Sequence, residues 1–318
     1  MGYDNPDIRT LPGEDGKAVS LNYAFFPLYP FLMRVVAAPL AVFGLSRIGT
    51  LTLAGLVIAL LGTLGAMLAL YDLARGWLGE AGGLRAAYYL LVFPTGFFLA
   101  QVYTEGLFLG LAFGALALIQ RRRLGWAAPL VALAIWTRAV GVALIVPMTL
   151  AAVEQIRKTR VQGRPPRDVW SPAAAALMPF LALAAWWVSP LRPAFQFIED
   201  NYFSRHFLAL DGSFGAWGYA WQQMTRGANG PTEMYYGLEF ALISIGLLGS
   251  LALLRKMPSV ALFSLTVFAI SFFSGVGQSM NRYVLALPAL FISLARLGED
   301  EVFDRGWTLA SVLLLGVL

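Results

Sequence analysis

The chain has 318 residues, of which 58% are hydrophobic and only 13% are charged. Soluble domains carry about 25% charged residues, so this composition excludes an ordinary soluble protein and indicates a polytopic membrane protein. The formal net charge of +5 comes from basic residues in short loops between apolar segments, which indicates membrane topology and no nucleic-acid partner.

Two residue counts limit the metal chemistry. The chain has no cysteine, which excludes disulfides and thiolate metal sites. Its single histidine, His206, excludes a multi-histidine metal centre.

The predicted elements begin with a polar loop over residues 1–23, which has no apolar run that would mark a signal peptide. The next stretch, 24–46, is apolar and rich in proline, and we expect it to form a surface or re-entrant helix on the outer face. About nine to ten membrane segments follow, with a polar outer loop over 191–235, and no repeat or linker divides the chain. We therefore predict a single all-α membrane domain over 1–318, with apolar segments at 48–72, 84–101, 103–120, 124–137, 139–154, 171–190, 236–254, 259–275, 283–297 and 306–318.

Basic loops fix the orientation of these segments. The positive-inside rule places the clusters at 121–123 and 157–167 in the cytoplasm. Counting forward and backward from them puts Glu105, Arg138 and Arg282 at the outer ends of their segments. Residues 1–23 then also lie outside, and this topology predicts a crossing helix upstream of Met1.

A carboxylate and two arginines thus share the outer side. A charge at the bilayer centre costs at least about 2.5 kcal/mol, so such residues lie at helix ends, form pairs or serve a function. Arginine offers a planar fork for phosphate oxygens, and a carboxylate can orient sugar hydroxyls. Together these three side chains suit a phosphorylated lipid, although each one alone is more typical of an interfacial anchor. His206, in the polar outer loop, is more typical of a solvated side chain. The outer loop adds Glu199, Asp200, Arg205, His206 and Asp211.

Four stretches carry a family resemblance. NYAFFPLYPFLMR (22–34), FPTGFFLAQVYTEGLFLGLAF (93–113), WTRAVGVALIVP (136–147) and SMNRYVLALPALF (279–291) resemble, in this order and spacing, the PIG-V-like mannosyltransferases. These belong to the GT-C superfamily of polytopic glycosyltransferases. The resemblance implies a GT-C-like helical bundle with a juxtamembrane helix on its outer face.

The same resemblance implies a reaction. A hexose, with mannose as the expected sugar, passes with inversion from a polyprenyl-phosphate donor to a glycolipid or glycan acceptor on the outer or luminal face. The eukaryotic members resemble enzymes that add the second mannose to the glycosylphosphatidylinositol precursor. The implied location is the plasma membrane of a bacterium or the endoplasmic reticulum of a eukaryote.

Residue roles follow from the matched motifs. Arg138 and Arg282 are implied to bind the donor phosphate, and Tyr103, Tyr283 and His206 to line the cleft. The family's catalytic base is a carboxylate in an outer loop after a first crossing helix. The opening MGYDNPD resembles the tail of that loop, so the base is expected upstream of Met1 unless Asp4 or Asp7 fills the role, and Glu105 is a secondary candidate. No cofactor is certain; a divalent cation is an alternative to arginine for stabilising the departing phosphate.

Two other classes of function stay open at this point. A non-catalytic member of the family, or a truncated chain, would bind lipid-linked sugar without turnover. A transporter or flippase would move it without bond formation, but the sequence lacks the internal repeat and paired interrupted helices typical of alternating access.

Overall fold

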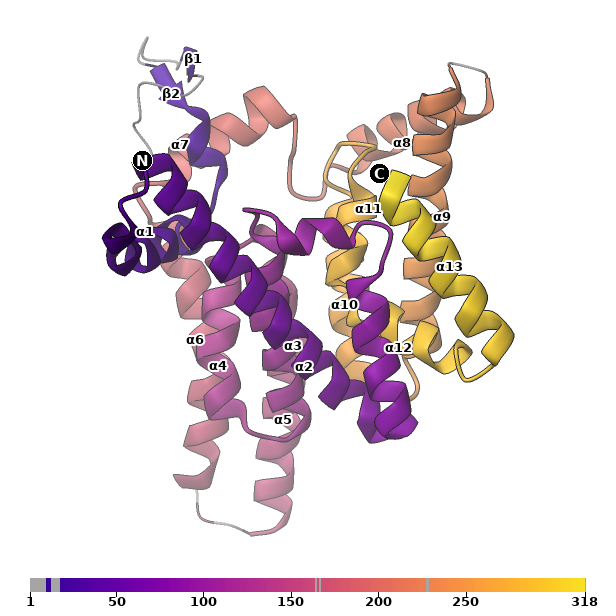
Figure 1. Cartoon of the computed structure of the whole chain (residues 1–318). Helices are drawn as coiled ribbons and strands as arrows, with labels where there is room; N and C mark the ends of the chain where they lie inside the picture. The colour runs from indigo at the N-terminus through magenta and orange to yellow at the C-terminus, as the bar shows by residue number, and fades with distance from the viewer. Residues whose placement is uncertain (1–9, 13–17, 164, 166, 227–228, 318) are drawn as a thin grey trace.

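The computed structural model describes residues 10–12, 18–163, 165, 167–226 and 229–317, and these fold as a helical bundle (Figure 1). The predicted all-α polytopic fold is confirmed. Near the N-terminus, β1 (Thr10–Pro12) and β2 (Ala18–Ser20) form a short antiparallel pair. The helices are η1 (Leu21–Ala24), α1 (Leu28–Leu40), η2 (Ala41–Phe43), α2 (Arg47–Leu91), η3 (Gly96–Ala100), α3 (Glu105–Gln120), α4 (Leu124–Ile135), η4 (Ala139–Leu144), α5 (Ile145–Val161), α6 (Arg167–Trp187), α7 (Arg192–Ile198), η5 (Glu199–Phe203), α8 (Leu210–Thr225), α9 (Gly230–Ala252), α10 (Pro258–Phe272), α11 (Met280–Tyr283), η6 (Val284–Ala286), α12 (Pro288–Leu297) and α13 (Glu301–Val317).

Helix α1 lies on the outside of the bundle. Tyr29 is its buried residue, and the Tyr29 hydroxyl donates a hydrogen bond of 2.9 Å to the carbonyl of Gly55 in α2. The helix and its continuation η2 end at Gly44, which adopts a left-handed φ of 64° that glycine reaches at little cost. A helix thus forms within the predicted stretch 24–46, and its depth in a membrane stays a prediction.

Helix α2 unites a predicted segment with the first part of the next. Its 45 residues are interrupted at Gly79, whose φ of 70° and ψ of −176° break the helical path. The second arm of the helix then packs against the first. A Cβ atom on Gly83 in the second arm would lie 2.8 Å from Cδ2 of Tyr71 in the first. The second arm ends at Leu91, just before Pro94, and continues as η3, so the predicted segment 84–101 is not one regular helix.

The apolar helices differ in length, and some are too short to cross a membrane as a single helix. Four helical stretches in the described part of the chain are long and apolar enough to cross a membrane: Arg47–Leu91, Ala139–Val161, Asp168–Trp187 and Gly230–Ala252. A fifth span results if Met280–Ala286 and Pro288–Leu297 count together across their 82° bend. The predicted segments 103–120, 124–137 and 259–275 form shorter apolar helices, α3, α4 and α10.

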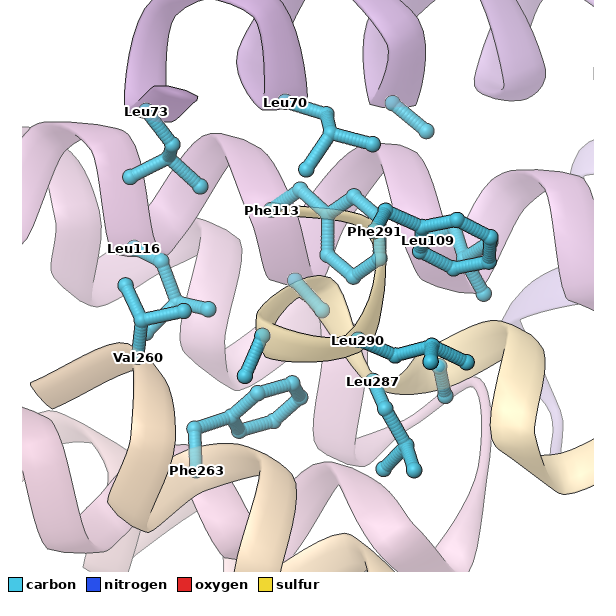
Figure 2. Close-up of a cluster of buried hydrophobic side chains, with 14 of the residues drawn as sticks. Leu70, Leu73, Leu109, Phe113, Leu116, Val260, Phe263, Leu287, Leu290 and Phe291 are labelled. Carbon is cyan, nitrogen blue, oxygen red and sulfur yellow. The ribbon is translucent and has the colours of Figure 1, made fainter. Parts of the chain in front are cut away.

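One large buried core joins distant parts of the sequence. Leu70 and Leu73 of α2 face Leu109, Phe113 and Leu116 of α3 (Figure 2). From the C-terminal half, α10 and the α12 region add Val260, Phe263, Leu287, Leu290 and Phe291 to the same cluster (Figure 2). This packing joins α2 and α3 to α10 and α12. Glu105 lies at the start of α3, and Arg282 lies in α11, shortly before α12.

The two ends of the bundle differ. The strands, α1, α7 and α8 gather at one end, and the turn between α5 and α6 lies at the opposite end (Figure 1). Residues 191–235, predicted as an outer loop, are largely helical, since they contain α7, η5 and α8. The predicted cytoplasmic arginines form ion pairs, with Arg121 bound to Asp72 and Arg122 to Glu154 at 2.5 Å.

Candidate functional site

The start of α3 is fixed by a close approach to α2. Gly106 and Gly110 face Gly62 across the helix crossing, and a Cβ atom on Gly106 would lie only 2.3 Å from the carbonyl oxygen of Ala59. Small residues four apart let two helix backbones approach in this way. The crossing therefore sets the position of Glu105, which begins α3 where the helix dipole favours a negative charge.

Glu105 binds both predicted arginines. Glu105 is 2% exposed, and its Oε1 lies 2.5 Å from Nη1 of Arg138 and 3.1 Å from Nε of Arg282. The same Nη1 of Arg138 donates a hydrogen bond of 3.0 Å to Oγ1 of Thr104. Arg138 precedes η4 and Arg282 lies in α11, so three separate segments of the chain meet at one carboxylate.

Aromatic rings surround the two guanidinium groups. The Arg282 guanidinium lies 5.5 Å from the ring centre of Tyr103, 5.2 Å from that of Tyr283 and 5.6 Å from that of Phe98. Arg138 lies 5.6 Å from the ring centre of Tyr283. These distances allow cation–π attraction, which strengthens where water is excluded. The cluster thus holds five of the residues that the sequence singled out: Tyr103, Glu105, Arg138, Arg282 and Tyr283.

A third arginine reaches the same tyrosine. Arg205, which follows η5, places its guanidinium 5.8 Å from the ring centre of Tyr283, and its Nε is buried without a hydrogen-bond partner among the described residues. Sequence reasoning placed Arg205 in the outer loop but gave it no role, because nothing near it in sequence distinguishes it from Arg192 or Arg226. Three guanidinium groups around one ring, with one carboxylate between two of them, favour an anionic ligand.

A second carboxyl group lies near Arg205. Burial raises the pKa of Glu199 from 4.5 to about 7, and the positive charge of Arg205 partly offsets this rise. The backbone amide of Arg205 donates to the carbonyl oxygen of Glu199 at 3.0 Å. Near neutral pH the charge balance around Arg205 therefore depends on whether Glu199 carries a proton.

The space at the centre of the cluster is small. A cavity of about 10 Å³ lies there, close to the least volume that holds one water molecule. A sugar or a phosphate group is far larger and does not fit inside this cavity, whereas the side chains of Arg138 and Arg282 keep 14% and 17% of their surface exposed. The lining residues are Glu105, Phe108, Leu109, Arg138, Val140, Arg282, Tyr283 and Ala286.

His206 does not line this cavity. His206 is about half exposed, and its Nδ1 lies 3.0 Å from Oδ1 of Asp200, outside the cavity lining. Asp4 and Asp7 lie outside the described residues. Among the described residues, no three or more histidine, aspartate or glutamate side chains form a group that could hold a metal ion.

Comparison with known proteins adds a family match. The model of the family described as Mannosyltransferase (PIG-V) matches residues 10–188, more than half of the chain. The matched part includes Glu105 and Arg138, whereas Arg205 and Arg282 lie beyond it. A search of the curated proteins found no match.

Solved structures show the fold. An Archaeoglobus fulgidus oligosaccharyltransferase, in complex with Zn and sulfate, is similar with a TM-score of 0.50 and 13% identity, over 94% of this chain and 44% of that chain. ArnT from Cupriavidus metallidurans, bound to undecaprenyl phosphate, gives 0.49 and 15%, over 86% of this chain and 50% of that one. The Archaeoglobus fulgidus oligosaccharyltransferase AglB, in complex with an inhibitory peptide and a dolichol-phosphate, gives 0.49 and 13%, over 99% and 48%. The chain spans half the length of these proteins or less, and the first likeness shows that the chain shares the fold of that part of the oligosaccharyltransferase.

Proposed function

Because the chain belongs to the PIG-V mannosyltransferase family, we propose that it is a membrane glycosyltransferase that moves a hexose from a polyprenyl-phosphate donor. Mannose is the expected sugar, and a glycolipid or surface glycan is the expected acceptor. An acceptor hydroxyl attacks the anomeric carbon while the bond from that carbon to the phosphate oxygen breaks. The configuration inverts, a base takes the hydroxyl proton, and polyprenyl phosphate leaves.

The observation that carries this proposal is the group of three arginines around Tyr283. The donor phosphate is a diester with one negative charge, and the leaving polyprenyl phosphate is a monoester that gains a second. Fixed guanidinium groups stabilise this developing charge more strongly than the charge of the bound donor, which is the condition for faster transfer. We assign phosphate binding to Arg138 and Arg282, with Arg205 as a third contact.

Glu105 has a positioning role in this scheme. Two guanidinium groups in a poorly solvated site repel one another, and the carboxylate between Arg138 and Arg282 offsets that repulsion. The cavity beside Glu105 is too small for a sugar acceptor, and both arginines already contact its carboxylate. Proton transfer therefore suits a carboxylate of the N-terminal region, such as Asp4 or Asp7, better than it suits Glu105.

The proposed active face is the outer or luminal one. The cluster lies where α3 and α11 begin, and α7, η5 and the start of α8 supply the segment that brings Arg205 to it. The predicted orientation places these starts outside. The lipid part of the donor would then lie in the bilayer beside the bundle, with its phosphate at the depth of the arginines.

Transfer by the purified protein tests the proposal. In liposomes with polyprenyl-phosphate mannose and a glycolipid acceptor, we expect labelled sugar to move to the acceptor. Arg138→Ala and Arg282→Ala should each lower the rate at least about 100-fold, the loss typical of removing a donor to a developing negative charge. Arg305→Ala is the matched control, because that arginine is 82% exposed and its ion pair with Glu301 is exposed as well.

The same assay separates the alternatives. Full activity of Arg138→Ala would remove this arginine from the mechanism. Donor binding by the wild-type protein without transfer would favour a non-catalytic protein, and movement of donor across the bilayer without bond formation would favour a flippase. Loss of transfer in a chelator, restored by magnesium, would assign a share of the phosphate stabilisation to a divalent cation.

A further inference from the structure

A second buried carboxylate lies beneath the segment that carries Arg282. Glu239 of α9 is 0% exposed, and the sequence analysis gave it no role. Its Oε1 accepts hydrogen bonds from the amide of Ser279 at 2.7 Å and from the Tyr235 hydroxyl at 2.6 Å. Its Oε2 accepts one from the amide of Asn281 at 2.8 Å. Both oxygens are thus engaged, and two of the three donors belong to the backbone around α11.

The backbone held by Glu239 is not one that the chain adopts freely. Ser279 has a left-handed φ of 68°, which is uncommon and unfavourable for a residue other than glycine. This conformation directs the amides of Ser279 and Asn281 to the same side, toward α9. Left without a partner in a poorly solvated place, each amide would carry the full cost of its lost hydration.

Two further contacts hold the same segment at its sides. The amide of Gly275 donates a hydrogen bond of 2.9 Å to Oγ of Ser213 in α8. The Oγ1 of Thr95 donates one of 2.8 Å to the carbonyl oxygen of Asn281. Glu239 binds the amide of Asn281, the residue directly before Arg282. Together these hydrogen bonds tie the loop before Arg282 to α9, α8 and the residue before η3.

We propose that Glu239 is a positioning residue for Arg282. By binding the amides of Ser279 and Asn281, its carboxylate fixes the start of α11 and so sets the reach of the Arg282 guanidinium toward Glu105 and the donor phosphate. This inference rests on the proposed function, because it assigns Glu239 to the same phosphate site. A carboxylate is required here, since one side-chain oxygen alone cannot accept from both amides in this geometry.

The first test is exchange of the loop amides, which needs no activity. In Glu239→Gln one oxygen becomes an NH₂ group that faces an amide donor. We expect the peptide covering 275–287 to exchange hydrogen at least about tenfold faster than in the wild-type protein, while α3 is unchanged. Ser244→Ala is the control on the same helix, because that exposed hydroxyl donates to the carbonyl oxygen of Phe240 within α9. Unchanged exchange in Glu239→Gln would overturn the proposal.

The second test compares kinetic constants per molecule of folded protein. We expect Glu239→Gln to raise the KM for the polyprenyl-phosphate donor about tenfold or more and to lower kcat, because a displaced Arg282 weakens both donor binding and stabilisation of the leaving phosphate. The acceptor KM should be unchanged. A merely structural role would lower only the amount of folded protein, with kcat and donor KM per folded molecule unchanged, and that result would overturn the proposal. If Glu239→Gln does not fold, Tyr235→Phe removes one donor to the carboxylate and should shift the same constants in the same direction by a smaller factor.

Binding of polyprenyl phosphate alone separates the two levels of inference. If the wild-type protein binds it and Glu239→Gln binds it about tenfold more weakly, the positioning role is supported. Equal binding by both proteins overturns the role of Glu239 and leaves the proposed function standing. If the wild-type protein binds no polyprenyl phosphate, the proposed function fails, and the assignment of Glu239 to a phosphate site fails with it.

Discussion

Glu105 shows how a charge is tolerated in a largely apolar helix. Both arginines contact one of its oxygens, and their side chains are only 14% and 17% exposed. A pair of this kind gains little net free energy over apolar residues of the same size, but losing one partner leaves an uncompensated charge in a poorly solvated place. The sharpest consequence at this scale therefore concerns removal of the carboxylate charge.

Glu105→Gln should lower the free energy of unfolding by about 3 kcal/mol, because Arg138 and Arg282 lose their shared counter-charge. Thermal unfolding in detergent, followed by tryptophan fluorescence, measures the effect. Glu301→Gln is the matched control, since Glu301 and Arg305 are both more than 80% exposed and such pairs contribute little. Equal unfolding midpoints for Glu105→Gln and the wild-type protein would contradict the buried ion-pair cluster.

At the scale of elements, the crossing of α2 and α3 decides where Glu105 lies. The two helices approach so closely at Gly62, Gly106 and Gly110 that a single methyl group would meet backbone atoms. Backbone cannot rotate away as a flexible side chain can, so the helices must separate to admit it. Any such shift is felt one residue away, at the carboxylate that holds the arginines.

Gly106→Ala should therefore cost about 1 to 3 kcal/mol of stability, as overpacking does, and should reduce donor-dependent transfer. Gly65→Ala provides the comparison on the same helix pair, because its Cβ would lie 3.8 Å from Cα of Gly110, an ordinary contact. Unfolding midpoints and transfer rates of the two variants measure the difference. Identical values for both variants would mean that the crossing adapts without cost.

Apolar segments allowed the sequence to predict most helices, but not where each one bends. The segment 84–101 ends early because Pro94 cannot continue a helix, and residues 191–235 form helices although their mixed polarity is typical of a loop. For the site, likewise, the sequence predicted some of the residues and missed others. The predicted sidedness grouped Glu105, Arg138 and Arg282, and the structure places these three side chains in contact. Arg205 and Glu239 could not be predicted, because each contacts a part of the chain that is distant in sequence. Arg205 contacts Tyr283, and Glu239 binds the loop at 279–281, and both contacts depend on how the helices pack.

The whole molecule has two chemically different ends. At one end α1, α7 and α8 gather, and at the other end lies the turn between α5 and α6, beside a basic stretch of sequence (Figure 1). The positive-inside rule assigns the α5–α6 turn to the cytoplasm, and α6 is long and apolar enough to carry the chain across before α7. The proposed reaction on the outer face depends on this assignment.

Single-cysteine labelling can test the orientation directly, because the chain has no cysteine of its own. Gln162→Cys lies in the α5–α6 turn and Gln196→Cys lies in α7, and both positions are exposed. With intact cells or sealed right-side-out vesicles, we expect a membrane-impermeant maleimide to label Gln196→Cys and to leave Gln162→Cys unlabelled until the membrane is permeabilised. A permeant maleimide, which should label both, controls for reactivity.

Labelling of Gln162→Cys in intact membranes, with Gln196→Cys protected, would invert the topology and move the arginine cluster to the cytoplasmic face. Labelling of both positions would mean that α6 does not cross the membrane, and the outer-face site would then lose the argument from sidedness that first identified it.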